Sequence, residues 1–175
     1  PVIQSILEVS KDKDVLAYNV ALIWKVMIFH RLTDIWGPIP YTEAGSGKEI
    51  VPYESQKEVY YKMFDDLNTA VTALKSELQK NPSANVFGTG DMIYGGDVNK
   101  WVKLANTLRL RLAIRISNVD GTKAKLEAEA AAVGPLMEEN ADDAKVEVAK
   151  WGSGGNGMPR MESFFQDVMS TSMES

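Results

Sequence analysis

The stretch from Asp91 to Ser117, DMIYGGDVNKWVKLANTLRLRLAIRIS, most constrains the fold of this chain. Asp97 suits the N-cap of a helix, and apolar residues follow it at spacings of three and four on one helical face: Trp101, Leu104, Ala105, Leu108, Leu112 and Ile116. Leu110 and Ile114 fall on the opposite face. A helix with apolar residues on two sides packs between neighbours. We therefore predict a central helix over 98–117, with three side chains almost fully buried: Trp101, Leu108 and Leu112.

The predicted central helix carries two arginines at its apolar stripe. Arg115 projects within the stripe, and Arg111 lies at its edge one turn earlier. A buried guanidinium needs an ionic partner, because an unpaired charge is costly in an apolar environment. We expect an Asp or Glu from another helix to pair with Arg115, as a structural ion pair and not as a ligand contact.

Residues 15–32 are apolar at 14 of 18 positions. Their length would suit a membrane span, but Lys25 at the centre and His30 near the end make that costly. We therefore predict a buried core helix that ends before the prolines at 38 and 40. His30 is the only histidine, and nothing beside it completes a catalytic group, so we expect it to border the core.

Further helices are predicted on both sides of the central one. Ser55–Glu58 forms a capping box ahead of a strongly amphipathic helix over 56–80. An Ala-rich stretch predicts a shorter helix over about 122–133. Residues 145–151, KVEVAKW, alternate as a short strand does, and another helix begins near Phe164. The expected fold class is all-α, with long loops and at most a short β-hairpin.

The prolines in WGPIPY (36–41) make a stiff turn after the first long helix. We expect Trp36 and Tyr41 to have structural roles, packed against helix ends. Replacing Trp36 with alanine is then predicted to lower thermal stability and to leave ligand affinity unchanged.

Composition excludes several classes of function. Apolar content of 45% and charged content of 25% are ordinary for a globular domain, and the net charge of −5 argues against nucleic acid as a partner. Without cysteine, disulfides and thiolate zinc sites are excluded, and one histidine rules out a multi-histidine metal site. The GSGKE loop (45–49) superficially resembles a phosphate loop. Such a loop would need Gly at position 42 and Ser or Thr at position 49, where this chain has Thr42 and Glu49. We therefore expect no metal and no cofactor.

Four stretches together resemble the SusD/RagB family, the outer-membrane nutrient-binding lipoproteins of Bacteroidota. They are LTDIWGPIPYTEA (32–44), PYESQKEVYYKMFDDLNTAV (52–71), DMIYGGDVNKWVKLANTLRLRLAIRISNVD (91–120) and MEENADDAKVEV (137–148). The resemblance implies a helical bundle of tetratricopeptide-like helix pairs. It makes residues 1–175 a single partial SusD-like domain, cut from a longer protein, since the chain begins at Pro1 without a methionine.

The resemblance also implies a surface-exposed lipoprotein of the outer membrane, held by an N-terminal lipidated cysteine that this chain lacks. Its implied partner is a SusC-like TonB-dependent transporter, with no other contact to the membrane. The implied cargo is a glycan, carbohydrate taken up as a nutrient, although some relatives take peptides. The family's ligand residues do not lie in the matching stretches, so none is assigned by resemblance.

We expect a non-enzymatic protein that binds polysaccharide or oligosaccharide. The alternative is a helical-repeat scaffold for a protein or peptide partner. A glycan hydrolase would need two carboxylates roughly 5–10 Å apart in a cleft, and no pair is singled out. For glycan contacts the sequence favours Trp151, which precedes the GSGGNG loop, and Asn156 within that loop. The competing interpretation makes Trp151 a loop anchor whose ring covers the core.

Overall fold

The structure, a computed structural model, describes residues 2–146, in which helices follow one another without any strand. The α-helices are α1 (Val2–Ser10), α2 (Val15–Trp36), α3 (Gln56–Lys80), α4 (Val98–Arg115) and α5 (Gly121–Ala132). Single 3₁₀ turns lie at Gly88–Gly90 and Asn140–Asp142. The all-α prediction is confirmed. The strand predicted over 145–151 and the helix near Phe164 fall almost wholly outside the described residues.

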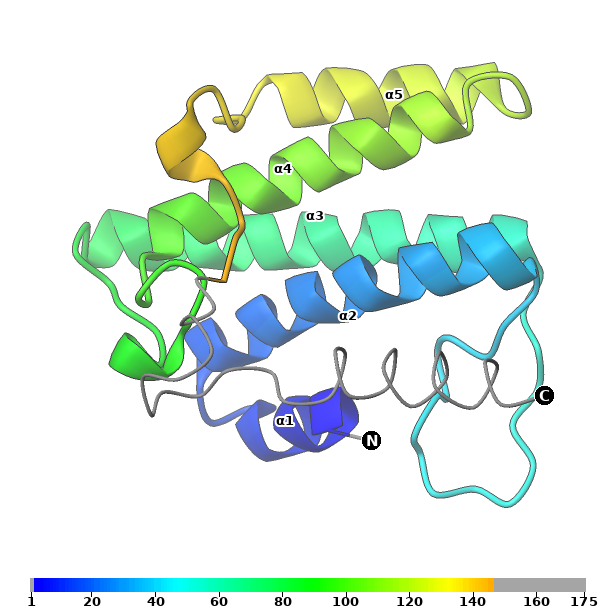
Figure 1. Ribbon diagram of the computed structural model, residues 1–175, viewed down its shortest axis with the longest axis horizontal. Helices are drawn as coiled ribbons and strands as arrows, with labels where there is room; N and C mark the ends of the chain where they lie inside the picture. The colour runs from blue at the N-terminus through cyan, green and yellow to red at the C-terminus, as the bar shows by residue number, and fades with distance from the viewer. Residues whose placement is uncertain (1, 147–175) are drawn as a thin grey trace, which may run out of the picture. The chain divides into compact units, whose positions relative to one another are not determined.

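Helices α2 to α5 stack in the order of the chain, each running back along the one before it (Figure 1). α1 packs against α2, and α4 also contacts α2. The result is two helical hairpins, α2 with α3 and α4 with α5, packed against each other. These elements form one unit, which ends at Ala144. That all 175 residues make one partial domain stays a prediction.

Side-chain caps explain where the helices begin. The Asp97 carboxylate accepts from the backbone N–H of Asn99 at 2.9 Å, as its place before the central helix predicts. The capping box of Ser55 and Glu58 is present at the start of α3. α2 extends past the apolar run of 15–32 and ends at Trp36, before the prolines as predicted, with Gly37 as its C-cap, whose φ of 73° favours glycine. The sequence analysis does not predict α1.

The core lies between the stacked helices and includes the three residues predicted for it. Trp101, Leu108 and Leu112 are 1%, 7% and 0% exposed, which confirms the prediction. On the other side of α4, Leu110 is half-buried but Ile114 is exposed. α4 therefore packs between α3 and α5 through one broad apolar face and not through two separate ones.

Replacing Leu112 with alanine is expected to lower the free energy of unfolding by about 2–5 kcal/mol, because it removes buried methyl groups and leaves a cavity. Urea unfolding followed by circular dichroism measures the change. Ile114→Ala, an exposed apolar residue two positions along the same helix, is the matched control and should change it by less than about 1 kcal/mol. Equal losses for the two variants would contradict this account of the core.

The arginine prediction is half right. Arg115 pairs with Asp34 of α2 at 2.9 Å, so its expected acidic partner on another helix is present. Its burial is wrong: the side chain is 55% exposed, because Arg115 is the last residue of α4 and lies at the end of the core. The buried arginine is Arg109, in the middle of α4, which binds Glu127 of α5 at 2.6 Å and Asn68 of α3 at 3.2 Å.

The WGPIPY turn places its two aromatic residues differently. Tyr41 is buried as predicted, with its hydroxyl donating to Asp66 at 2.6 Å and the Lys25 ammonium over its ring. The prediction that Trp36 packs against helix ends is wrong, since its side chain is 72% exposed. Trp36 ends α2, and the chain turns at Gly37 so that Ile39 and Tyr41 enter the core and the indole remains outside.

By length and composition, α2 is also the one described helix that would suit a membrane span. A helix in the core of a soluble protein meets the same criteria, and 44% of its most apolar window is buried. Lys25 within it pairs with Asp66 of α3 at 3.4 Å. These contacts fit the predicted core helix.

Candidate functional site

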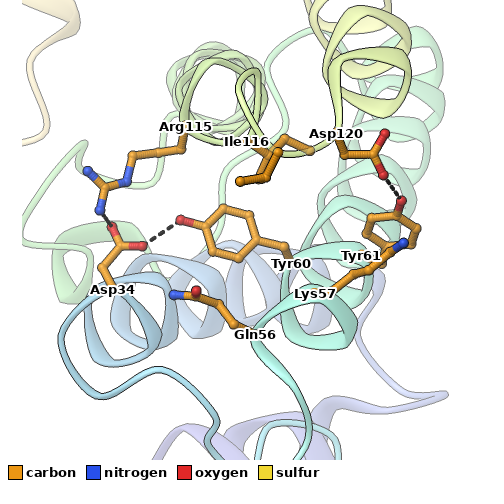
Figure 2. Close-up of a pocket in the computed structure, with 9 residues that line it drawn as sticks. Asp34, Gln56, Lys57, Tyr60, Tyr61, Arg115, Ile116 and Asp120 are labelled. Atoms are coloured by element: carbon orange, nitrogen blue, oxygen red, sulfur yellow. Dashed lines mark hydrogen bonds and ion pairs between the residues drawn. The ribbon is translucent and has the colours of Figure 1, made fainter.

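A polar hollow of about 400 Å³ lies at the end of the helices where α2 and α4 finish and α3 and α5 start (Figure 2). That volume is in the range of small-ligand pockets. Four separate segments meet there because the helices alternate in direction. The residues that line the hollow are Asp34, Gln56, Lys57, Tyr60, Tyr61, Arg115, Ile116, Val119 and Asp120.

On one side of the hollow, Asp34 joins three helices (Figure 2). Its carboxylate accepts a hydrogen bond from the Tyr60 hydroxyl of α3 at 2.5 Å and pairs with the Arg115 guanidinium of α4 at 2.9 Å. Burial of Tyr60, together with its hydrogen bond to Asp34, raises the pKa of the Tyr60 hydroxyl to about 12. The hydroxyl therefore stays a hydrogen-bond donor across the physiological range.

On the other side, Asp120 has a second tyrosine as its partner. It accepts from the Tyr61 hydroxyl at 2.5 Å and caps α5 through the backbone N–H of Lys123 at 3.0 Å. These hydrogen bonds, that from Tyr61 most of all, lower the pKa of the Asp120 carboxyl. The Lys57 ammonium lies over the ring of Tyr61, 5.4 Å from its centre.

The chemistry of this hollow is that of a polar binding surface. Asp120 is a poor general acid because its lowered pKa keeps it ionised, whereas glycoside hydrolysis needs a carboxyl that holds its proton. Hydrogen-bonding capacity remains on the half-exposed Arg115 and on Gln56, whose amide N–H group donates to the carbonyl of Thr33 at 2.8 Å. Among residues 2–146, no group of three or more acidic or histidine side chains is arranged to hold a metal ion.

The raised pKa of Tyr60 predicts a loss of stability at alkaline pH. Above pH about 10 the tyrosine ionises in the unfolded chain, while the folded state keeps its proton until about 12. The unfolded state then binds fewer protons, so the free energy of unfolding falls as pH rises through this window. Urea unfolding at several pH values should show a shallower fall for Tyr60→Phe than for the wild type. Identical slopes would contradict the assignment.

The predicted glycan contacts, Trp151 and Asn156, lie outside the described residues, so both stay predictions. His30 is buried and its Nδ1 lies 3.0 Å from the carbonyl oxygen of Val26, which agrees with a place at the edge of the core. The hollow could not be singled out from the sequence, because Tyr60 falls within the apolar stripe of the amphipathic 56–80 helix and nothing beside it marks it as a binding residue. A tyrosine in such a stripe needs a partner for its hydroxyl, and Asp34 supplies it.

Comparisons with known proteins identify relatives. The model of the SusD-like family, described as Susd and RagB outer membrane lipoprotein, matches residues 1–175. A chitin-binding SusD homolog from Flavobacterium johnsoniae shares 42% identity, with a TM-score of 0.78 over 85% of this chain and 31% of its own. A SusD homolog from Bacteroides uniformis shares 39% identity, with a TM-score of 0.76 over 85% of this chain and 30% of its own.

A SusD homolog from Bacteroides vulgatus shares 34% identity, with a TM-score of 0.77 over 86% of this chain and 31% of its own. No curated protein sequence matches the chain. The chain thus spans less than a third of the length of these solved relatives. The match of the family model over residues 1–175, together with these identities, shows that the chain belongs to the SusD-like family of outer-membrane lipoproteins.

Proposed function

We propose that the protein binds oligosaccharide or polysaccharide at the surface of the outer membrane and delivers it to a SusC-like TonB-dependent transporter. The observation that carries this proposal is the 42% identity to a chitin-binding SusD homolog. The chain covers 31% of that relative, so the proposal concerns the complete protein. Under this proposal the protein is a binding protein and not an enzyme, and an N-terminal lipid anchors the protein in the membrane.

The test is binding by the full-length protein. Affinity electrophoresis and pull-down on insoluble chitin, with cellulose and starch as comparisons, should reveal a retained polysaccharide, and calorimetry with its oligosaccharides should give a saturable isotherm. Co-purification from the native membrane should bring down a TonB-dependent transporter. Binding to polypeptide alone would favour the alternative, a helical-repeat scaffold. Release of reducing sugar would contradict a purely binding role.

Within this proposal, Trp151 is a flat platform for a sugar ring and Asn156 donates or accepts hydrogen bonds with hydroxyls. Trp151→Ala is expected to weaken binding by about 1–3 kcal/mol, by analogy with aromatic stacking on other flat ligands, and to leave thermal stability unchanged. Calorimetry with the retained oligosaccharide measures the loss. Phe87→Ala, which removes an exposed aromatic residue from the loop between α3 and α4, is the matched control. Unchanged affinity in the Trp151 variant would exclude this residue from the site.

A further inference from the structure

α2 differs from the other helices because it is apolar on the outside as well as the inside. Its inner side contributes Val20, Ile23 and Val26, all fully buried. On its outer side Ile28, Leu32 and Ile35 recur at helical spacing and are followed by Trp36, and all four are exposed. Arg31, also exposed, is the one charged residue among Ile28, Leu32 and Ile35 on this side. A helix that is mostly apolar on its outer side as well as its inner side belongs inside the core of a larger protein or inside a membrane. Lys25 pairs with Asp66 of α3, and this ion pair favours the interior of a protein over a membrane as the surroundings of α2.

A second hollow of about 400 Å³ lies beside this outer side of α2. Its lining is apolar and aromatic and includes Phe29, Leu32, Trp36, Pro38, Pro40 and Tyr53. The polar side-chain atoms it offers are the indole N–H of Trp36 and the hydroxyl of Tyr53. No charged or amide side chain lines the hollow, so it lacks the groups that bind an ion or the hydroxyls of a sugar. It suits the apolar side chains of another polypeptide segment.

The loop that forms this hollow is held in place. Ile39 and Glu54 exchange two backbone hydrogen bonds, at 3.2 and 3.0 Å. The Glu54 carboxylate also accepts from the backbone N–H groups of Tyr41 and Thr42, at 2.9 and 2.6 Å. Tyr53, next to Glu54, is nevertheless 74% exposed, as exposed as Trp36. The aromatic rings are therefore presented on a preformed surface, which lowers the entropic cost of covering it.

We infer that the outer side of α2, with Ile28, Leu32, Ile35, Trp36 and Tyr53, is an internal surface of the complete protein, covered by a further segment of the same polypeptide. The length of the solved relatives supports this occupant, since this chain matches only 30% and 31% of two of them. An exposed Trp and Tyr beside an apolar hollow are the residues that dominate a buried contact. This inference rests on family membership and not on glycan binding.

The test is the reactivity of a single cysteine in the isolated full-length protein. Ile35→Cys is introduced in a background without other free thiols, and its labelling by a maleimide is followed in the native state and in concentrated guanidinium chloride. Lys125→Cys is the matched control, because Lys125 lies on a polar, exposed side of α5. For each variant, the labelling rate in the native state is divided by the rate in guanidinium chloride. This ratio should be lower for Ile35→Cys than for Lys125→Cys by about tenfold or more.

Equal relative rates in the isolated protein would overturn the inference. Protection that appears only when a co-purified transporter is added would overturn it too, and so would protection that grows with protein concentration, which would indicate a second copy. Hydroxyl-radical footprinting of the unsubstituted full-length protein gives a second measurement, in which Trp36 and Tyr53 should oxidise slowly. Rapid oxidation of both would overturn the inference. If the full-length protein binds no glycan but Ile35→Cys is still protected from labelling, the proposed function is contradicted and this inference stands.

Discussion

Replacing Asp91 with alanine is expected to lower the free energy of unfolding by about 3–5 kcal/mol, because several buried donors would lose their acceptor. Asp91 is 9% exposed. It accepts from the indole N–H of Trp101 at 2.8 Å and from the backbone N–H of Gly96 at 3.0 Å. It also accepts from the N–H groups of Ile93 and Tyr94, at 2.9 and 3.2 Å. One side chain thus fastens the loop before α4 to the largest buried ring.

Urea unfolding followed by tryptophan fluorescence and circular dichroism checks this result. Asp97→Ala removes a carboxylate from the same loop but only a helix cap, so it should cost about 1 kcal/mol. Asp91→Asn keeps the shape of the side chain and one acceptor oxygen. Its loss in the free energy of unfolding should lie between those of Asp91→Ala and Asp97→Ala. A cost for Asp91→Ala no larger than that for Asp97→Ala would show that the loop does not depend on this carboxylate.

Glu127→Ala is expected to cost about 3–5 kcal/mol, because it leaves a buried guanidinium without its carboxylate. Glu127 binds Arg109 at 2.6 Å and Lys123 at 2.7 Å, and its side chain is 5% exposed. After its removal Arg109 retains the amide oxygen of Asn68 at 3.2 Å, which does not neutralise the charge. Lys123 extends into water more easily, since its side chain is already 21% exposed.

Two controls isolate the effect of the buried charge. Glu129→Ala removes an exposed carboxylate from the same helix, 3.8 Å from Lys125, and should cost less than about 1 kcal/mol. The double variant Arg109→Met with Glu127→Leu removes both charges and should recover most of the lost stability. If it remains as unstable as Glu127→Ala, packing around the pair and not the unpaired charge causes the loss.

The parts of the fold that could be predicted are those with local causes. The helix starts at Ser55 and Asp97 follow from side chains that bond to the backbone a few residues away. The burial of Trp101 and Leu112 follows from the helical period. α1 was not predicted, although Val2–Ser10 has one apolar and one polar side.

What could not be predicted depends on how far along a helix its neighbours reach. Arg109 and Arg115 both lie beside the apolar stripe of α4, and only the packing of α5 and α3 shows that the first is buried and the second is not. Trp36 is exposed for a similar reason, since it lies where α2 ends. The polar hollow combines Asp34, Tyr60 and Asp120, and no spacing rule relates positions on three different segments.

The stacking of each helix on its neighbour in the chain also has a kinetic consequence. Contacts between α2 and α3, and between α4 and α5, join helices that follow one another in the chain, and proteins dominated by such local contacts fold within roughly milliseconds. The slower steps are then the long-range anchors, such as the hydrogen bond from the Tyr94 hydroxyl to the carbonyl of Asp142. In a cell, the helices would form soon after synthesis, and the segment around Asp142, which bonds back to Tyr94, would be fixed last.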